Sequence, residues 1–427
     1  MTGERRTDGA FAASMAATFF AIVTLFWVLK PLKKGLFLRT YDAAGLSVLG
    51  LQLTSAQAEL LAKVANLGVA LVAAVAFTAL ARRMRPHRLA LVVTACFVAG
   101  HGVFAWLLRA PGETTVWAFY LYGDLWSTAM IAALFAFLND SVSPAQARRL
   151  YGPIGVGGVL GGVVGSTSVA TWLTRLALPA WLGVCATGTV AVFGLMAAAG
   201  RLAPARASAA APEPEAGPAA LAAVRRVARS RYLLALVAMV GLYEMASTLL
   251  DFQFSGTVAR QLDGGAIDAH LARVFAITNA TALGVQLLVT PFVLSYLGVG
   301  PGLLVLPGAA LAAEAVFAAA PALWTGSALS IADNALNYSI QQSSRETLYV
   351  PLGREEKLEA KAVIDVFVQR LAKVFAIGVS LLLTLTLGGR TGLRWLAVPA
   401  AVVLVLWIAC ARFAGRSFER LARKEMP

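Results

Sequence analysis

The chain has 427 residues, of which 59% are hydrophobic and 14% are charged, and its mean hydropathy is +0.74. Soluble domains usually carry about 25% charged residues, so this composition excludes a chain that lies mainly in water. The formal net charge of +14 raises the question of a nucleic-acid partner, but we expect none because the basic residues follow a membrane pattern, described below.

Twelve apolar stretches follow one another, each close to the roughly 20 residues that cross a bilayer as a helix. Backbone polar groups in lipid must be satisfied within a segment, and barrel strands show weaker apolar runs, so we predict an all-α integral membrane protein with twelve transmembrane helices. The predicted ranges are 12–38, 57–81, 88–108, 116–138, 152–174, 180–199, 231–254, 271–297, 301–319, 322–345, 360–388 and 392–413.

The first helix carries three lysines on one face. Lys30, Lys33 and Lys34 stand at positions i, i+3 and i+4, beside Pro31, which could break or kink the helix. Two interpretations are open. The lysines could snorkel from a helix end, or they could form an anion-binding stripe, which we favour because the apolar sequence resumes directly after them.

The second and fourth helices carry acids. Glu59 and Lys63 are four residues apart, and we expect them to pair with each other. Asp124 lies among aromatic and apolar residues in "FYLYGDLWSTAM". An acid inside the membrane is by default a functional candidate, and a structural salt bridge to a lysine is the alternative.

The fifth helix contains the glycine-rich run "YGPIGVGGVLGGVVGS". It matches neither a Walker loop nor a dinucleotide-binding fingerprint, because no Gly-Lys-Ser/Thr follows and no strand precedes it. Gly157, Gly161 and Gly165 are spaced four apart, as are Gly158 and Gly162. This spacing predicts a bare helix face against which another backbone packs closely.

Residues 200–230, rich in Ala, Pro and Arg, interrupt the apolar pattern and predict a cytoplasmic linker. It separates an N-terminal six-helix bundle (1–199) from a C-terminal one (231–427), the plan of major-facilitator-type transporters. Lys and Arg concentrate in alternate loops, at 82–88, 201–231, 345–361 and 412–424. By the positive-inside rule both termini are expected in the cytoplasm.

The second half repeats the pattern of intramembrane polar faces. In the seventh helix Glu244, Ser247, Thr248 and Asp251 recur at helical spacing. In the tenth, four polar residues are predicted to share a face that could bind a polar ligand or join helices; these are Asp333, Asn337, Gln341 and Ser344.

The eleventh helix carries Asp365, Gln369 and Lys373 at i, i+4 and i+8, with Arg370 beside them. If the two halves enclose one cavity, this second cationic face would stand opposite the lysines of the first helix. Such an arrangement would suit a multiply charged anion, because basic groups replace its water and acids hold those groups at other times.

At these residues the sequence resembles a known family. The stretch "ETLYVPLGREEKLEAKAVIDVFVQRLAK" (346–373) is similar to the signature of the ATP/ADP translocases of plastids and obligate intracellular bacteria, the NTP/NDP exchange transporters. The stretches "LKPLKKGLF", "YGDLWS" and "VGLYEMASTLLDFQF" resemble that family's first, fourth and seventh helices. The departures are Lys34 in place of an acid and Val374-Phe375-Ala376 in place of small, flexible residues.

The resemblance implies a nucleotide or phosphorylated-anion carrier in a bacterial inner membrane. It places Lys33 and Lys373 on the family's substrate-critical lysines, and Asp124 and Glu244 on its acids. We predict further residues for each role. The further substrate-binding residues are Lys30, Lys34, Arg370, Asn337 and Gln341, and the further charge-coupling residues are Asp251 and Asp365.

Two other functions stay open. The chain could be a proton-coupled transporter of another organic solute, with Asp124 and Glu244 as proton carriers, or a non-transporting membrane sensor or assembly protein. We predict no enzyme, cofactor or metal site, because Cys96, Cys185 and Cys410 are unpaired and no nucleophile, base or ligand cluster emerges. The expected partners are an anionic small molecule and membrane lipids, and the expected state is a monomer.

Overall fold

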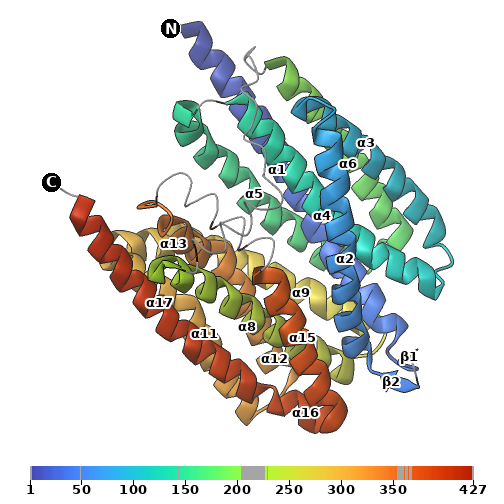
Figure 1. The fold of residues 1–427 in the computed structure, drawn as a ribbon. Coiled ribbons are helices and arrows are strands. Elements are labelled where there is room, and N and C mark those ends of the chain that lie inside the picture. The colour runs from blue at the N-terminus through green and yellow to red at the C-terminus, as the bar shows by residue number, and fades with distance from the viewer. Residues whose placement is uncertain are drawn as a thin grey trace. The chain divides into compact units, whose positions relative to one another are not determined.

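The structure is a computed structural model that describes residues 2–425 except 49, 143, 203–226, 228, 353–359, 361–363 and 365–367. Most of the predicted linker therefore lies outside the described residues. Contacts divide the chain into two compact units, each a bundle of helices (Figure 1). The N-terminal unit comprises Met1–Ala210 and Leu262–Asn279, and the C-terminal unit comprises Ala211–Gln261 and Ala280–Pro427.

The N-terminal unit is built from six consecutive helices and the first part of a later one, α9. The helices are α1 (Thr2–Thr40), α2 (Ser55–Ala81), α3 (Pro86–Leu107), α4 (Glu113–Ser141), α5 (Pro144–Trp172), α6 (Leu178–Leu202) and α9 (Gly265–Gly284). Pro31 lies inside α1, which continues as a helix to Thr40. Thus Pro31 does not end the helix, and the three lysines that surround it are not at its terminus.

A small hairpin joins α1 to α2, in a stretch where no strand was predicted. Strand β1 (Leu46–Val48) pairs antiparallel with β2 (Leu51–Leu53), so that Ser47 faces Gln52. Gly50, between the strands, has a φ of +81°, which glycine adopts without steric cost. Each strand has only three residues, so the hairpin is a connection within an otherwise helical unit.

The C-terminal unit begins with a long helix, and several of its later helices contain π-helical turns. The helix that precedes α9 is α8 (Arg231–Gln261). The elements that follow α9 are η1 (Val285–Val289), α10 (Thr290–Phe292), η2 (Val293–Leu297), α11 (Val299–Ala319), α12 (Leu323–Leu336), η3 (Asn337–Gln341), α13 (Gln342–Thr347), α15 (Gln369–Thr386), α16 (Gly389–Trp395) and α17 (Ala397–Glu425).

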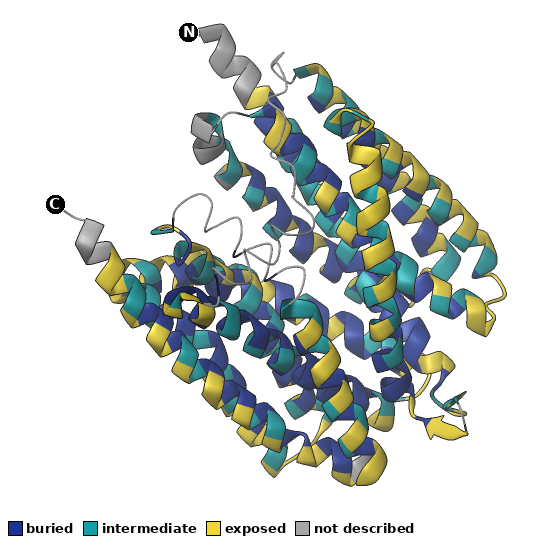
Figure 2. Cartoon of the chain, in the orientation of Figure 1, coloured by how far each residue is buried: buried dark blue, intermediate teal, exposed yellow. Residues whose placement is uncertain are grey.

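Eleven helices among the described residues are long and apolar enough to cross a membrane. The tenth predicted segment, 322–345, is not one of these eleven. It is helical from Leu323 onward, through α12, η3 and α13, and it contains more polar residues than the eleven. Many large apolar residues are exposed on the helices, and Figure 2 shows how much of α2 is exposed. Val72 is 70% exposed and Leu371 is 68% exposed, which suits contact with lipid.

The glycine face of α5 packs on the backbone of α1, as predicted. A Cβ added at Gly157, Gly161 or Gly165 would run into three successive α1 carbonyl oxygens, also four residues apart, which are those of Ala16, Phe20 and Thr24. Larger side chains at these positions would push the two helices apart. The close approach fixes α1, the helix that carries the lysines, within its bundle.

Candidate substrate site

Lys33 and Lys34 are buried in the interior of the N-terminal unit. Their relative exposures are 6% and 4%, and the next turn of α1 is buried as well, with Phe37 at 0%. A lysine that snorkels would place its ammonium group at the membrane surface, so the snorkelling interpretation is wrong for these two residues. Each ammonium group instead meets a carboxylate.

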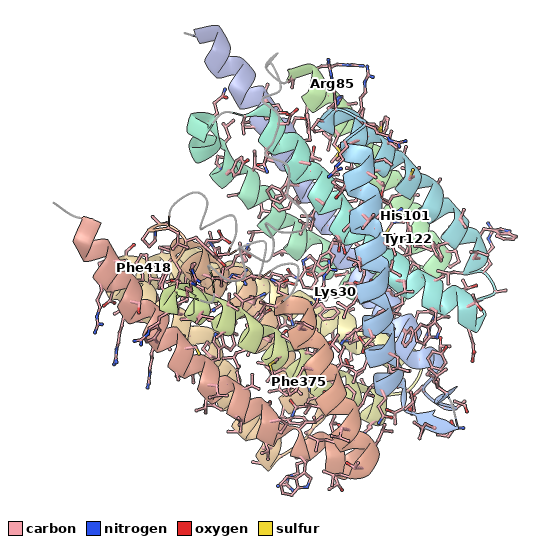
Figure 3. The ribbon with its side chains drawn as sticks, in the orientation of Figure 1. Lys30, Arg85, His101, Tyr122, Phe375 and Phe418 are labelled. Carbon is pink, nitrogen blue, oxygen red and sulfur yellow. The ribbon has the colours of Figure 1, made fainter. Side chains whose placement is uncertain are left out.

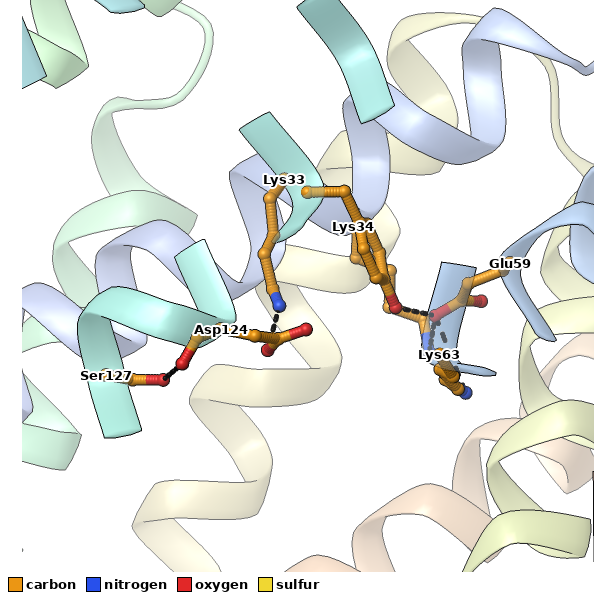
Figure 4. A network of polar contacts seen from close by, with 7 residues as sticks. Lys33, Lys34, Glu59, Lys63, Asp124 and Ser127 are labelled. Carbon is orange, nitrogen blue, oxygen red and sulfur yellow. Dashed lines mark hydrogen bonds and ion pairs between the residues drawn. The ribbon is translucent and has the colours of Figure 1, made fainter. Parts of the chain in front are cut away.

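Lys33 of α1 forms an ion pair with Asp124 of α4 (Figure 4). The lysine lies close to α4 because residue 123 is a glycine: a Cβ there would come within 2.7 Å of the Lys33 Cδ. The ring of Tyr120, one turn earlier on α4, lies 4.6 Å from Nζ and adds a cation–π contact. The Asp124 side chain is 28% exposed, against 7% for Lys33, so the carboxylate is the more accessible partner.

Lys34 and Lys63 share one buried acid. Oε1 of Glu59, on α2, lies 3.2 Å from the Lys34 ammonium and 3.6 Å from that of Lys63. The Tyr120 hydroxyl also donates to this oxygen, at 3.1 Å. The predicted pairing of Glu59 with Lys63 is confirmed, and Lys34 joins it (Figure 4). Two carboxylates therefore face three lysines, and the cluster keeps a positive surplus.

The ammonium group of Lys30 lies against aromatic rings. Figure 3 labels this lysine. Its ammonium group is 4.5 Å from the ring centre of Trp27 and 5.0 Å from that of Phe275, on α9. Both rings belong to the N-terminal unit. These cation–π contacts stabilise the ammonium group within the N-terminal unit.

The C-terminal unit contains a second lysine–acid pair. Lys373 of α15 lies 3.2 Å from Oε2 of Glu244, on α8. The lysine side chain is 44% exposed and the glutamate side chain is 12% exposed. Here the cation is the accessible partner, whereas in the pair of the N-terminal unit it is the acid. In each unit, one lysine singled out from the sequence thus meets one acid singled out from the sequence.

A polar contact one turn further along α8 joins it to α12. The Ser247 hydroxyl donates to Oδ2 of Asp333 at 2.6 Å, and the Asp333 side chain is buried. The segment from Asp333 to Ser344 is not a regular α-helix, because η3 inserts a wider π-helical turn at Asn337–Gln341. Asp333, Gln341 and Ser344 are all buried. Beyond η3, Ser344 donates to the carbonyl of Ile340 and packs near Gly302.

The remaining predicted residues lie on α8, η3 and α15 or outside the described residues. Arg370 lies on the first turn of α15 and is partly buried, and Asp251 lies on α8 two turns after Glu244. Asn337 is partly buried, while Gln341 is buried and its Oε1 has no hydrogen-bond donor. Asp365 lies outside the described residues.

Sequence analysis missed several contacts that join distant segments. These are the pairs Lys34–Glu59, Tyr120–Glu59, Ser247–Asp333, Gln253–Glu314 and Arg39–Asp268. Four of these residues, Lys34, Glu59, Ser247 and Asp333, were candidates because they are polar groups within predicted membrane helices. Which of them meet was not readable from spacing, because every pair spans at least 25 residues of sequence.

Within the part of the chain that the structure describes, no three His, Cys, Asp or Glu side chains gather as a metal site would require. The chemistry available at the two pairs is electrostatic. Lysine offers three N–H donors on a flexible stem, and both carboxylates only accept. An anion that reached either lysine could take the place of its carboxylate.

Comparison with known proteins agrees with this chemistry. The family model described as TLC ATP/ADP transporter matches residues 219–418, a range that includes Glu244 and Lys373. This part of the chain is similar to the TLC ATP/ADP transporter family. Similarity to individual members of the family also reaches into the N-terminal unit, as the following relatives show.

The chain is 23% identical over 346 residues to "ADP,ATP carrier protein 1" of Chlamydia muridarum, covering 70% of this chain and 65% of that carrier. It is 30% identical over 142 residues to the "Plastidic ATP/ADP-transporter" of Solanum tuberosum, covering 32% of this chain and 22% of that protein. The chain thus spans less than two thirds of the length of these relatives.

Solved structures of transporters have the same fold as this chain. The nucleoside transporter NupG superposes with a TM-score of 0.61 at 13% identity, covering 97% of this chain and 99% of that one. A bacterial homologue of the lysosomal transporter Spinster superposes with a TM-score of 0.52 at 13% identity, covering 98% of each chain. The chain is therefore an all-α, multi-pass membrane protein with a major-facilitator-type fold.

Proposed function

We propose that this chain is a membrane carrier that exchanges nucleotides of the ATP/ADP type, or a related phosphorylated anion, by alternating access. The match of residues 219–418 to the family model and the names of the Chlamydia and potato relatives support nucleotide exchange. The observation that carries the proposal is that Lys33 pairs with Asp124 and Lys373 with Glu244, one such pair in each unit.

In this proposal Lys33 and Lys373 bind the phosphate groups. A phosphate competes with Asp124 and Glu244 for the ammonium groups, because charge-assisted hydrogen bonds to phosphate and carboxylate are similar in strength. Lysine suits this exchange since a point charge on a flexible stem can change partners with little rearrangement. Substrate binding would thereby break the lysine–acid pairs, and substrate release would restore them. The conformation of the carrier would then depend on whether substrate is bound.

The other proposed roles are secondary. Lys30, Lys34 and Arg370 supply further positive charge, Asn337 and Gln341 offer amide groups to the rest of the substrate, and Asp251 and Asp365 balance charge. We also propose that the protein acts as a monomer without enzymatic activity, with both termini in the cytoplasm and 200–230 as a linker between two six-helix halves in a bacterial inner membrane.

Counterflow of labelled nucleotide into proteoliposomes tests the proposal. Vesicles preloaded with ADP should accumulate labelled ATP, and Lys33→Ala and Lys373→Ala should abolish the uptake. Arg175→Ala is the matched control: its guanidinium also lies on an aromatic ring, 4.8 Å from Trp172, but outside the spans. It should transport at the wild-type rate. Each variant is first checked for a wild-type elution profile and melting temperature.

Full transport by both lysine variants would contradict the assigned roles. If wild-type vesicles show no nucleotide counterflow and an imposed proton gradient drives uptake of another solute, the proton-coupled alternative replaces the proposal. If no phosphorylated anion raises the melting temperature of the purified protein, substrate binding itself is contradicted, because a ligand of the folded form must stabilise it.

A further inference from the structure

A buried acid of the C-terminal unit takes part in neither lysine–acid pair. Glu314 of α11 is 1% exposed and Gln253 of α8 is 0% exposed. Nε2 of Gln253 donates to Oε1 of Glu314 at 2.7 Å. Among the described residues no lysine, arginine or histidine pairs with Glu314, whereas Glu59, an equally buried acid, has two lysines.

The hydrogen bond leaves two oxygen atoms of this pair unsatisfied. Oε2 of Glu314 and Oε1 of Gln253 are both buried and both lack a hydrogen-bond partner. An ionised carboxylate can only accept hydrogen bonds, so in that form neither oxygen can satisfy the other. A buried carboxylate with one neutral donor and no cation costs several kcal/mol, roughly the penalty that buried ions carry without a partner.

One proton removes both defects. When Oε2 of Glu314 is protonated, it becomes an O–H donor. Oε1 of Gln253, which otherwise has no donor, can accept this hydrogen bond. A carboxylic acid and a primary amide can join through two hydrogen bonds, one in each direction. The neutral acid therefore satisfies every polar atom of the pair.

The charged groups on the surrounding elements are engaged elsewhere or form no ion pair with Glu314. Arg394 of α16 donates to the carbonyl of Ala318 at 2.9 Å, and Asp333 of α12 accepts from Ser247. Other titratable groups lie on α8 and on the elements that contact α11. Those whose side chains the structure describes are Arg231, Tyr232, Tyr243, Glu244, Asp251 and Arg260 on α8, Tyr296 on η2, Tyr338 on η3, Arg345 and Glu346 on α13, and Cys410, Arg412, Arg416, Glu419 and Arg420 on α17.

We infer that Glu314 is a proton-binding site of the C-terminal unit, whose proton joins α11 to α8 through Gln253. The inference does not depend on which solute the protein carries. Loss of the proton leaves a bare carboxylate between the two helices, so the contact is stable only while the site is occupied. Since α8 also carries Glu244, the proton stabilises the helix that presents one of the two proposed substrate pairs.

Infrared difference spectroscopy of the purified protein at neutral pH tests the site. Glu314→Gln should remove one carboxylic-acid C=O band from the wild-type spectrum. Gln253→Met, which keeps the acid but takes away its partner, should keep that band and move it to higher frequency. Glu113→Gln is the control, because Glu113 is an exposed residue in the first turn of α4, and it should remove no such band.

Thermal unfolding gives a second readout. A group that holds a proton in the folded protein contributes stability that is lost as pH rises and the proton leaves. The wild-type melting temperature should therefore fall more steeply between neutral and alkaline pH than that of Glu314→Gln. If that variant does not fold, the band shift in Gln253→Met carries the test. An unchanged carboxyl spectrum in both variants, or equal pH slopes, would overturn the inference.

Discussion

Replacing Asp124 by asparagine would leave the ammonium group of Lys33 inside the bundle without its counter-charge. Removing one member of a buried ion pair typically costs about 3–5 kcal/mol, because the remaining charge is uncompensated. Two features of the structure reduce this cost. The Asp124 side chain is 28% exposed, so water reaches the pair, and the Tyr120 ring stays 4.6 Å from Nζ.

A cation–π contact in a partly desolvated setting contributes about 1–2 kcal/mol. We therefore expect Asp124→Asn to lower the free energy of unfolding by about 2–3 kcal/mol, at the low end of the range for broken buried pairs. Equilibrium unfolding in detergent measures the difference. Adding Lys33→Met to Asp124→Asn should restore stability to within about 1 kcal/mol of wild type, since removing both charges is usually near neutral.

The same variant tests whether an anion can take the place of the carboxylate. Free phosphate or ATP should raise the melting temperature of Asp124→Asn more than that of the wild type, because no carboxylate competes for Lys33. Two results would refute the reasoning. Asp124→Asn could prove as stable as the wild type, or the double variant could prove less stable than Asp124→Asn alone.

Three further predictions concern packing, hydrogen bonding and pH. Gly161→Leu should destabilise the protein by about 1–3 kcal/mol, because its side chain overlaps the α1 backbone; Gly155→Ala, in the same helix but with open space around it, should leave thermal unfolding nearly unchanged. Ser247→Ala should cost about 1–3 kcal/mol in equilibrium unfolding, since Asp333 loses a donor to a buried carboxylate; no loss would contradict the contact. Burial raises the pKa of the Tyr41 phenol above its ordinary value, and a hydrogen bond from an indole partly opposes this. The neutral phenol is the favoured form, so its contribution is present below pH 10.0 and is lost as pH rises through the raised pKa; melting temperatures of Tyr41→Phe should fall less at strongly alkaline pH than those of wild type.

Much of the fold followed from local features of the sequence. Apolar stretches of bilayer length located the membrane helices, because a helix must satisfy its own backbone wherever lipid surrounds it. The four-residue spacing of Gly157, Gly161 and Gly165 predicted a close helix contact, and the structure places α1 there. Family resemblance and intramembrane charge selected the same lysines and acids. Each of these signals lies within a few turns of one helix.

Other features depended on which helices become neighbours. The segment around Asn337 looked like a regular polar helix, and only packing decided that a π-helical turn interrupts it. The sequence did not mark Gln253 as a candidate, because it is a neutral residue in an apolar helix. Its importance comes from its hydrogen bond to Glu314, which is 61 residues away in sequence. The spacing of residues along the chain does not predict contacts between side chains on different helices.

Charge and hydropathy in the sequence by themselves determined that this is a membrane-spanning helical protein with costly ions inside it. Only the tertiary structure determined which carboxylate pairs with each lysine. Lys33 pairs with Asp124, which is 91 residues away in sequence, whereas the adjacent Lys34 pairs with Glu59. The reason is that burying a charge is tolerable only beside a partner, and helix packing, not sequence distance, determines which partner lies within reach.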